Sequence, residues 1–247
     1  MSSLSGKGVL ITGGGSGIGL AAARLFLQEG AKVAIAGRNA SKLRQAAEGL
    51  KGGDRLVYHA ADVSDAGQVQ KLVEQATKAL GRVDVLVNNA GLNIRDRAFR
   101  LLTVESWKNL VGSNLEGAFY CINAVLPQML ARKEGLIINI NSISGKRASP
   151  LGGAAYSAAK FGLRGLAMGL AAEEKDNGIR VCSIYPGEVD TPILEHRPTP
   201  LSDEQLLTFM TERPDAQQCA DALGQLALDQ GSRDNVSVIV IDVTETK

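Results

Sequence analysis

The stretch GVLITGGGSGIG (residues 8–19) runs from an apolar, β-branched segment through a glycine-rich turn into the start of a helical pattern. We expect residues 8–12 to form a strand and a helix to begin at residue 17. The glycines at 13, 17 and 19 fit the spacing T-G-x-x-x-G-x-G, whose first gap is longer than that of G-x-G-x-x-G. Glycine permits a tight turn and a close backbone approach to a pyrophosphate at a helix N-terminus. The stretch therefore predicts a nucleotide site, with a plain glycine-rich turn as the alternative.

The rest of the chain repeats this alternation of short apolar runs and longer amphipathic segments. Several runs are apolar without alternation, as expected of strands that are covered on both faces of a parallel sheet. The predicted strands are residues 8–12, 32–37, 55–60, 83–90, 135–141, 179–185 and 236–243. The predicted helices are roughly residues 17–29, 40–50, 65–80, 103–132, 155–177 and 214–228. This order predicts an α/β protein, a doubly wound, mostly parallel sheet of about seven strands (a Rossmann fold) in a single domain over residues 1–247.

Composition argues against several classes of function. The chain has 27 Lys and Arg against 26 Asp and Glu, without a basic block, so we expect no nucleic-acid partner. No apolar run is long enough to span a bilayer and the N-terminus lacks a signal-peptide pattern, which predicts a cytoplasmic protein without a membrane partner. The three cysteines lie far apart and there are only two histidines, so we expect no metal site and no histidine-based triad.

The segment YSAAK (156–160) places a tyrosine and a lysine four residues apart. Positions i and i+4 lie on one face of a helix, so Tyr156 and Lys160 are expected to be neighbours. Taken alone, the pair is typical of a packed tyrosine beside a solvated lysine. The other motifs of the chain, in their order, suggest a different interpretation of this pair.

Seven short motifs in a fixed order resemble those of the short-chain dehydrogenases/reductases over roughly residues 5–195. They are TGGGSGIG (12–19), DV (62–63), NNAG (88–91), NLEGAF (114–119), INS (140–142), YSAAK (156–160) and YPGEVDT (185–191). Each motif is weak singly, whereas the ordered set is specific. The resemblance implies an NAD(P)(H)-dependent enzyme that interconverts a small-molecule carbonyl and an alcohol, and it implies a homodimer or homotetramer.

The resemblance also implies roles for individual residues. Tyr156 would be the general acid/base and Lys160 its activating partner; both would also contact the cofactor. Ser142 would hydrogen-bond the substrate oxygen, and Asn114 would support a proton-relay water. The other residues expected at the cofactor are Gly13, Gly17, Ile18 and Gly19 near its phosphates, Asp62 and Val63 at the adenine, Asn89 and Ala90 on the adenosine side, and Pro186, Gly187, Val189 and Thr191 at the nicotinamide end.

The chemistry of these residue types agrees with the implied roles. Hydride transfer to a carbonyl creates a developing alkoxide that needs a proton and hydrogen-bond donors. A free phenol has a pKa of about 10, which is too high to serve both directions of the reaction near neutrality. A cation one helical turn away favours the phenolate, so we expect Lys160 to lower the pKa of Tyr156. Ser142 would add a second donor at the end of the fifth strand, where open α/β sheets bind their ligands.

The end of the second strand indicates which nicotinamide cofactor is used. A dehydrogenase selective for NAD needs a carboxylate there to accept hydrogen bonds from the ribose hydroxyls. This chain has Gly37 followed by Arg38. Glycine leaves room for a 2′-phosphate, and a guanidinium offers it charge-assisted hydrogen bonds. We therefore predict NADP(H) in preference to NAD(H), with a solvated turn arginine as the alternative for Arg38.

The chain departs from the family pattern in two places. Asn141-Ser142 stands where two serines are common, and we assign the hydrogen bond to Ser142. Residues 231–243, GSRDNVSVIVIDV, resemble the end of PP2C-type phosphatases, in which the Asp of R-D-N, here Asp234, binds metal. The other acidic motifs of such a site are missing, so a phosphatase is disfavoured. A catalytically silent NADP(H)-sensing or scaffold protein remains the alternative function, and residues 190–212 are expected to form a substrate lid.

Overall fold

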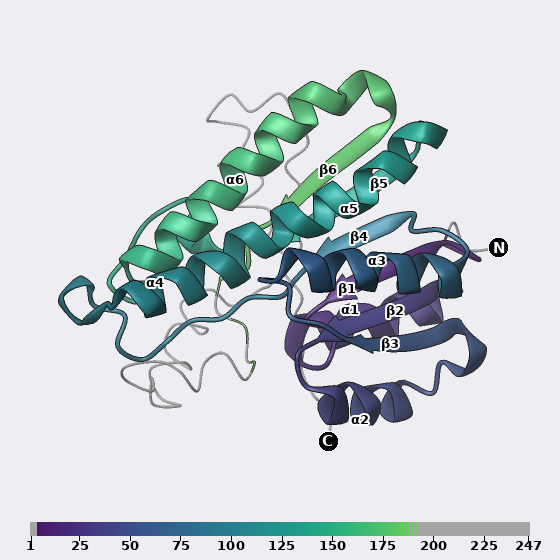
Figure 1. Cartoon of the computed structure of the whole chain (residues 1–247), viewed down its shortest axis with the longest axis horizontal. Coiled ribbons are helices and arrows are strands. Elements are labelled where there is room, and N and C mark those ends of the chain that lie inside the picture. The colour runs from purple at the N-terminus through teal and green to yellow at the C-terminus, as the bar shows by residue number, and fades with distance from the viewer. Residues whose placement is uncertain (1–3, 188, 190, 192–247) are drawn as a thin grey trace, which may run out of the picture.

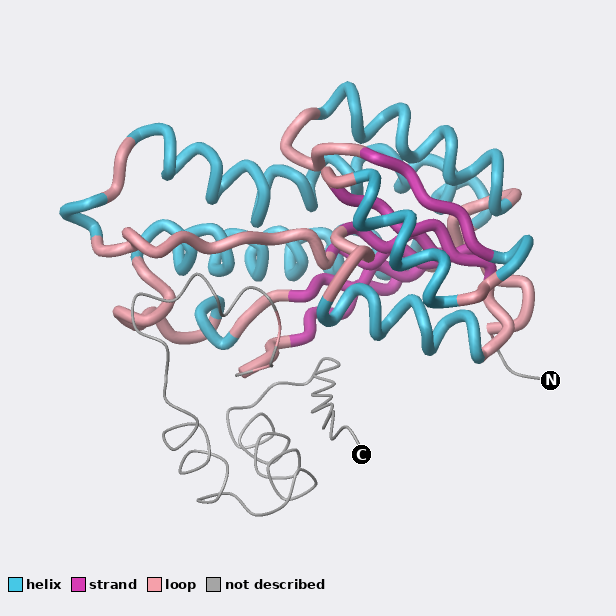
Figure 2. Tube along the Cα trace, turned by 90° about the horizontal axis from the view of Figure 1, so that it is seen from below, coloured by secondary structure: helices cyan, strands magenta, loops and turns pink. Residues whose placement is uncertain are grey.

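The computed structural model describes residues 4–187, 189 and 191. Within them, six strands form one parallel sheet in the order β3-β2-β1-β4-β5-β6. Figure 2 shows the strands lying between two layers of helices. The doubly wound α/β fold predicted from the sequence is therefore confirmed. The strands are β1 Gly8–Thr12, β2 Lys32–Gly37, β3 Leu56–Ala60, β4 Val85–Asn88, β5 Gly135–Ile140 and β6 Ile179–Ile184.

The helices follow the strands in sequence and cover both faces of the sheet (Figure 1). One apolar cluster packs α1 and α2 on one face, and a second packs α3, α5 and α6 on the other. The α-helices are α1 Gly17–Gln28, α2 Ala40–Leu50, α3 Ala66–Leu80, α4 Val104–Val111, α5 Gly117–Arg132 and α6 Ala154–Glu174. The short helical turns are η1 Gly53–Arg55, η2 Phe99–Leu101, η3 Gly112–Glu116, η4 Ile143–Gly145 and η5 Lys175–Asn177.

The prediction of one continuous helix over residues 103–132 is wrong. The structure divides this segment into α4, the π-helical turn η3 and α5. The Asn114 side chain donates hydrogen bonds to the carbonyl of Leu110, four residues earlier, and to that of Leu92, at 2.9 and 2.8 Å. A side chain that enters the backbone hydrogen-bond ladder widens the turn, which explains why the helix changes pitch here.

The strand order fixes where a ligand can bind. The chain first builds β1, β2 and β3 in one direction and then returns to add β4, β5 and β6 on the other side of β1. In an open parallel sheet, the crevice at the carboxyl ends of the strands beside this reversal is the usual ligand site. The Thr12 side chain links the ends of β1 and β4 there, because its hydroxyl donates to the carbonyl of Val87 and accepts from the backbone N–H groups of Asn89 and Ala90.

Three sequence predictions fall on residues that the structure does not describe. They are the helix at 214–228, the strand at 236–243 and the substrate lid at 190–212, of which only residue 191 is described. In the part of the chain that is described, no helix is both long and apolar enough to cross a membrane.

Candidate active site

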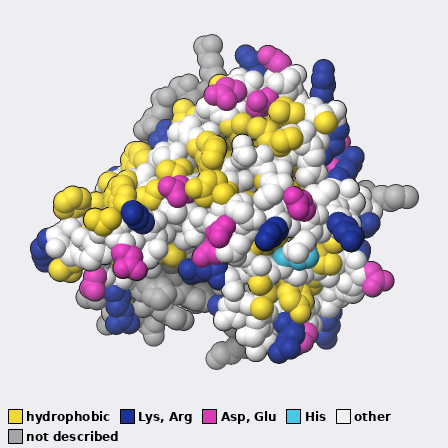
Figure 3. Space-filling model, viewed as in Figure 1, with side chains coloured by type: hydrophobic (Ala, Val, Ile, Leu, Met, Phe, Trp, Pro, Cys, Tyr) yellow, Lys and Arg dark blue, Asp and Glu magenta, His cyan; other side chains and the backbone are white. Residues whose placement is uncertain are grey.

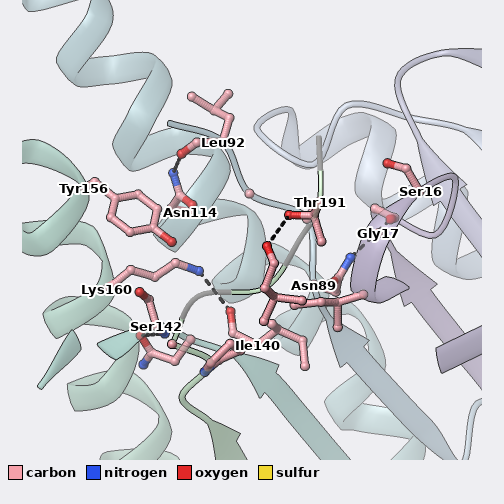
Figure 4. Close-up of a pocket in the computed structure, with 18 of the residues that line it drawn as sticks. Ser16, Gly17, Asn89, Leu92, Asn114, Ile140, Ser142, Tyr156, Lys160 and Thr191 are labelled. Atoms are coloured by element: carbon pink, nitrogen blue, oxygen red, sulfur yellow. Dashed lines mark hydrogen bonds between the residues drawn. The ribbon is translucent and has the colours of Figure 1, made fainter. Parts of the chain in front are cut away.

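A cavity of about 340 Å³ opens at the carboxyl ends of the central strands, where Figure 4 shows the predicted site residues converging. Tyr156, Lys160, Ser142 and Asn114 lie toward one end, and the glycine loop lies toward the other. The predicted residues that line this cavity are Gly13, Gly17, Ile18, Arg38, Asn89, Ala90, Asn114, Ser142, Tyr156, Lys160, Pro186, Gly187, Val189 and Thr191.

A second hollow of about 130 Å³ adjoins the first. It is lined by the predicted adenine residues Asp62 and Val63, together with Gly37 at the end of β2. Gly13, Arg38 and Ala90 line both hollows, so the two together form one elongated site. Such a shape suits a dinucleotide that extends from an adenine end to a nicotinamide end.

The glycine loop brings the N-terminus of α1 to the cavity. Gly13 has a φ of +66°, and a Cβ atom there would lie 2.7 Å from Nδ2 of Asn89. That amide donates to the carbonyls of Thr12 and Gly13 at 2.9 and 3.1 Å, so the loop is fastened to the end of β4. Ser16, the N-cap residue, makes no side-chain hydrogen bond to the helix. The N–H groups in the first turn of α1 are therefore open to an anion, which the helix dipole also favours.

Gly19 was predicted to lie near the cofactor phosphates together with Gly13 and Gly17. It is buried in the first turn of α1 and is absent from the lining of both hollows. A Cβ atom at this position would lie 2.5 Å from both Nδ2 of Asn89 and the carbonyl oxygen of Gly13. Gly19 thus allows α1 to pack against its own glycine loop, whereas Gly13 and Gly17 face the cavity.

Tyr156 lies in the first turn of α6 and Ser142 lies just beyond β5. Burial raises the pKa of the Tyr156 phenol above its ordinary value, while a hydrogen bond with Ser142 and the charge of Arg97 act in the opposite direction. The net lowering of the Tyr156 pKa that we expected from the Lys160 cation is therefore wrong for this structure. Desolvation of the phenolate is the larger effect, and it was not visible in the spacing of YSAAK.

The Lys160 side chain is 3% exposed, and its ammonium lies 5.7 Å from the centre of the Tyr156 ring. Its Nζ atom donates to the carbonyl of Ile140 at 2.9 Å. Burial lowers the pKa of Lys160 to about 8. The solvated lysine considered for the isolated motif is thus excluded, because this amine is inside the protein at the edge of the cavity.

Asn114 presents an acceptor to the same region. Its Nδ2 atom is used by Leu92 and Leu110, while its Oδ1 atom is buried and has no hydrogen-bond partner among the described residues. A Cβ atom on Gly91 would lie 2.6 Å from this oxygen, so any other residue at position 91 would crowd it. A buried acceptor without a partner is a natural position for a bound water.

The cavity has further lining residues that were not predicted: Ser16, Gly91, Leu92, Ile140 and Asn141. Gly91 closes the motif NNAG, so the sequence did carry a signal for it. Ile140 and Asn141 belong to the motif INS (140–142), whereas Leu92 follows NNAG and carries no signal of its own. The side-chain oxygen of Asn141 accepts a hydrogen bond from the N–H of Ser142, which fixes the backbone at that residue.

Comparison with known proteins agrees with this geometry. The 3-oxoacyl-acyl-carrier-protein reductase FabG of Thermotoga maritima is 36% identical over 244 residues, which cover 97% of each chain. The crystal structure of a metagenomic short-chain oxidoreductase in complex with NADP is 37% identical with a TM-score of 0.71, covering 76% of this chain and 85% of that one. Levodione reductase is 33% identical with a TM-score of 0.74, covering 78% and 76% respectively.

These comparisons also bear on the C-terminal residues. The FabG alignment covers nearly the whole of this chain, and it is an alignment with an oxidoreductase. The resemblance of residues 231–243 to PP2C-type phosphatases, and with it a metal-binding Asp234, is therefore not supported. These residues lie outside the part of the chain that the structure describes.

The family model described as short chain dehydrogenase matches residues 7–201, which include all the motifs that converge on the cavity. The protein thus belongs to the short-chain dehydrogenase family and is an oxidoreductase.

Proposed function

We propose that this enzyme uses NADP(H) to interconvert a carbonyl and a secondary alcohol, with Tyr156 as the general acid/base. The observation that carries the proposal is the convergence of Ser142, Tyr156, Lys160 and Asn114 at one end of a cavity whose other end is an uncapped helix N-terminus. Relatives named for reduction of a 3-oxoacyl group and of levodione support a carbonyl substrate. A moderately apolar ketone or a 3-oxoacyl group is the substrate class we propose.

The residues present fit a phosphorylated nicotinamide cofactor. The open N–H groups of α1 suit the pyrophosphate. Arg38 lines both hollows, and a Cβ atom on the neighbouring Gly37 would meet only Leu43, at 3.7 Å, so space remains beside the guanidinium. Arg38 offers the charge-assisted bonds that a 2′-phosphate requires. The NADP complex of the metagenomic relative supports the same choice.

When bound, the nicotinamide supplies or accepts the hydride, and residues of the chain donate or remove the proton. In reduction, the Tyr156 hydroxyl donates its proton to the oxygen of the carbonyl as negative charge develops there. The Ser142 hydroxyl donates a hydrogen bond to the same oxygen. Lys160 and a water on Oδ1 of Asn114 would return a proton to the phenolate. In oxidation, the phenolate of Tyr156 removes the proton of the alcohol.

The alternative is a silent NADP(H)-binding scaffold on the same fold. It would tolerate loss of the proton-donating groups, but Ser142, Tyr156 and Lys160 are all present and line one cavity. Their arrangement favours an enzyme.

The proposal is tested by following the oxidation of NADPH with a panel of carbonyl compounds that includes levodione and an acetoacetyl thioester. We expect turnover by the wild type and a loss of about a thousandfold or more in Tyr156→Phe, because that variant keeps the ring and lacks the proton. The affinity for NADPH, measured by fluorescence titration, should survive in the variant. Undiminished turnover in Tyr156→Phe would remove Tyr156 from the mechanism. Tight NADPH binding by a wild type inactive on the whole panel would favour the scaffold.

We further propose a homodimer or homotetramer in the cytoplasm, built from a single domain whose lid is formed by residues 190–212. Figure 3 shows hydrophobic side chains gathered over α4, α5 and α6. Large exposed apolar residues on these elements and on η2 support a subunit interface there: Phe99, Val104, Trp107, Phe119, Phe161 and Met168. Size-exclusion chromatography with light scattering measures the mass of the assembly, and a monomer would contradict this part of the proposal.

A further inference from the structure

We infer that Lys146 is a positioning residue for Ser142: its ammonium stacks on the ring of Tyr185 and so fastens the turn after β5 to the segment after β6. The inference rests on the proposed role of Ser142 as a hydrogen-bond donor to the substrate oxygen. Neither Lys146 nor Tyr185 lines the cavity, so the contact between them acts through the neighbouring residues that do.

The contact between Lys146 and Tyr185 is a cation–π interaction. The Nζ atom of Lys146 lies 4.4 Å from the centre of the Tyr185 ring. A cation within about 6 Å of a ring centroid is attracted to the face of the ring. Lys146 forms no salt bridge with any residue that the structure describes. Because Lys146 ends η4, behind β5, and Tyr185 directly follows β6, the contact joins the continuations of two neighbouring strands.

The backbone of the same two segments continues the pairing of β5 with β6. The N–H groups of the residues on either side of Ser142 donate to the carbonyls of the residues on either side of Tyr185. These hydrogen bonds run from Asn141 to Ile184 at 2.8 Å and from Ile143 to Pro186 at 3.1 Å. Ser142 and Pro186 both line the cavity. The spacing between these two walls of the cavity is therefore set where Lys146 meets Tyr185.

The turn η4 also orients the Ser142 hydroxyl. The Oγ atom of Ser142 accepts a hydrogen bond from the N–H of Ser144 at 3.1 Å. Since a hydroxyl has one hydrogen and two acceptor lone pairs, this bond leaves the hydrogen available to donate to a substrate oxygen. The bond exists only while the turn is closed, and the turn is closed by the N–H of Lys146, which donates to the carbonyl of Ile143 at 2.9 Å.

Close packing restrains η4 on its other side. Gly145 is buried within the turn. A Cβ atom there would overlap Oδ1 of Asn141 and would lie 2.8 Å from the carbonyl oxygen of Lys160 on α6. This packing limits movement of the turn toward α6, and the contact of Lys146 with Tyr185 limits its movement away from β6. A small displacement of a group that binds the reacting oxygen lowers the rate of the chemical step.

The first test is amide hydrogen exchange, followed by mass spectrometry on peptides that cover η4, and it needs no substrate. We expect Lys146→Met to speed exchange in these peptides, because the turn opens more often without the contact. Lys146→Arg keeps a cation for the ring and should exchange like the wild type. Arg147→Met is the matched control: it removes the exposed cation at the next position, which has no ring contact or ion pair among the described residues, and should leave the exchange unchanged.

A double-mutant cycle identifies the partner. Tyr185→Leu should speed exchange as Lys146→Met does, and the double variant should exchange little faster than either single variant, because both substitutions remove the same contact. Tyr185→Phe keeps the ring and should resemble the wild type. Effects that add up in the double variant would show that the two side chains act separately and would overturn the inference. If Tyr185→Leu does not fold, the Lys146 variants decide the question.

Kinetics on the carbonyl found active in the panel supply the second readout. Lys146→Met should lower kcat by about two- to fivefold, the size expected for a cation–π contact at a partly exposed site, and Lys146→Arg should restore it. The affinity for NADPH should stay close to that of the wild type. An unchanged kcat in Lys146→Met, or a loss that Lys146→Arg does not restore, would overturn the inference. An inactive wild type would instead refute the proposed function, and the exchange measurements would then decide the inference alone.

Discussion

Replacing Lys160 by methionine should stabilise this enzyme while abolishing its activity. The amine is 3% exposed and its pKa falls from 10.5 to about 8, a difference of about 2.5. At about 1.4 kcal/mol for each pKa unit, keeping the ammonium inside the folded protein costs about 3 kcal/mol at pH 7. Methionine removes that cost and fills a similar volume. It also leaves the Ile140 carbonyl without its donor, a loss of about 1 kcal/mol. The net expectation is a gain of about 2 kcal/mol.

The pH dependence distinguishes this cause from better packing. Between pH 8 and pH 10.5 the unfolded chain holds the Lys160 proton more tightly than the folded chain, so the stability of the wild type rises with pH through this window. The advantage of Lys160→Met should therefore be greatest at pH 7 and should shrink to nothing near pH 10.

The assay is urea denaturation of both proteins without cofactor at pH 7, 8.5 and 10, at one fixed protein concentration because oligomers unfold in a concentration-dependent way. Lys175→Met is the matched control, since Lys175 is exposed at the far end of α6. It should change the midpoint little at any pH. A Lys160→Met protein that is less stable at pH 7, or one whose advantage does not vary with pH, would refute the reasoning.

Three other substitutions test different parts of the structure. Arg38→Ala should lower the ratio of kcat/KM for NADPH to that for NADH by about 10- to 100-fold, because a charged hydrogen-bond partner of the 2′-phosphate is removed; an unchanged ratio would assign the preference elsewhere. Asp84→Ala should lower the free energy of unfolding by about 3 kcal/mol, since this carboxylate is 4% exposed, accepts a hydrogen bond from the N–H of Gly8 at 2.8 Å and forms an ion pair with Arg82 at 2.8 Å. Its control is Glu134→Ala, which removes the exposed carboxylate of the same cluster of ion pairs and should change the free energy of unfolding little. Equal losses of stability in the two variants would show that Asp84 is not the main contributor. Gly153→Ala should lower both stability and kcat, because of its positive φ and the contact with Arg97, whereas Gly165→Ala, with open space at its Cβ, should stabilise α6 by about 0.5–1 kcal/mol; thermal melts that rank the two the other way would contradict this.

Local sequence patterns were sufficient to predict most of the fold and the location of the candidate site. The predicted limits match the structure for two strands and one helix, at residues 8–12, 32–37 and 40–50. The spacing of apolar residues defines these elements, and it can be read from the local sequence alone. The residues proposed for cofactor binding and proton transfer were expected to lie together because their motifs follow strands whose carboxyl ends meet at one edge. The π-helical turn at η3 was not predictable in this way. It depends on a contact between Asn114 and Leu92, which comes from outside the helix.

Other features that the sequence did not indicate share that cause, which is three-dimensional context. Spacing indicated that Tyr156 and Lys160 are neighbours, but the direction of each pKa depends on burial, which neighbours in sequence do not report. Gly19 satisfied the glycine pattern equally well as a phosphate contact or as a packing position. The proximity of Asn89 shows the packing position, which the pattern did not indicate. The hydrogen bond from Arg97 to the carbonyl of Leu151 joins residues 54 apart, and no motif marks it.

The charged side chains at the amino ends of the strands (the amino edge) are arranged differently from those at the carboxyl ends (the carboxyl edge). At the amino edge, Lys7 and Arg82 are paired with Asp84 and Glu134, and the partially exposed cations surround a buried carboxylate. At the carboxyl edge, Lys160 is buried against a carbonyl oxygen and forms no ion pair among the described residues. Pairing at the first edge satisfies the charges and serves stability. An unpaired buried cation destabilises the protein, and its strain is relieved when negative charge arrives beside it. The carboxyl edge is therefore preorganised for the anions that the proposed reaction brings there, namely phenolate and developing alkoxide. Lys160→Met removes this buried cation, and for that reason we expect the variant to be both more stable and inactive.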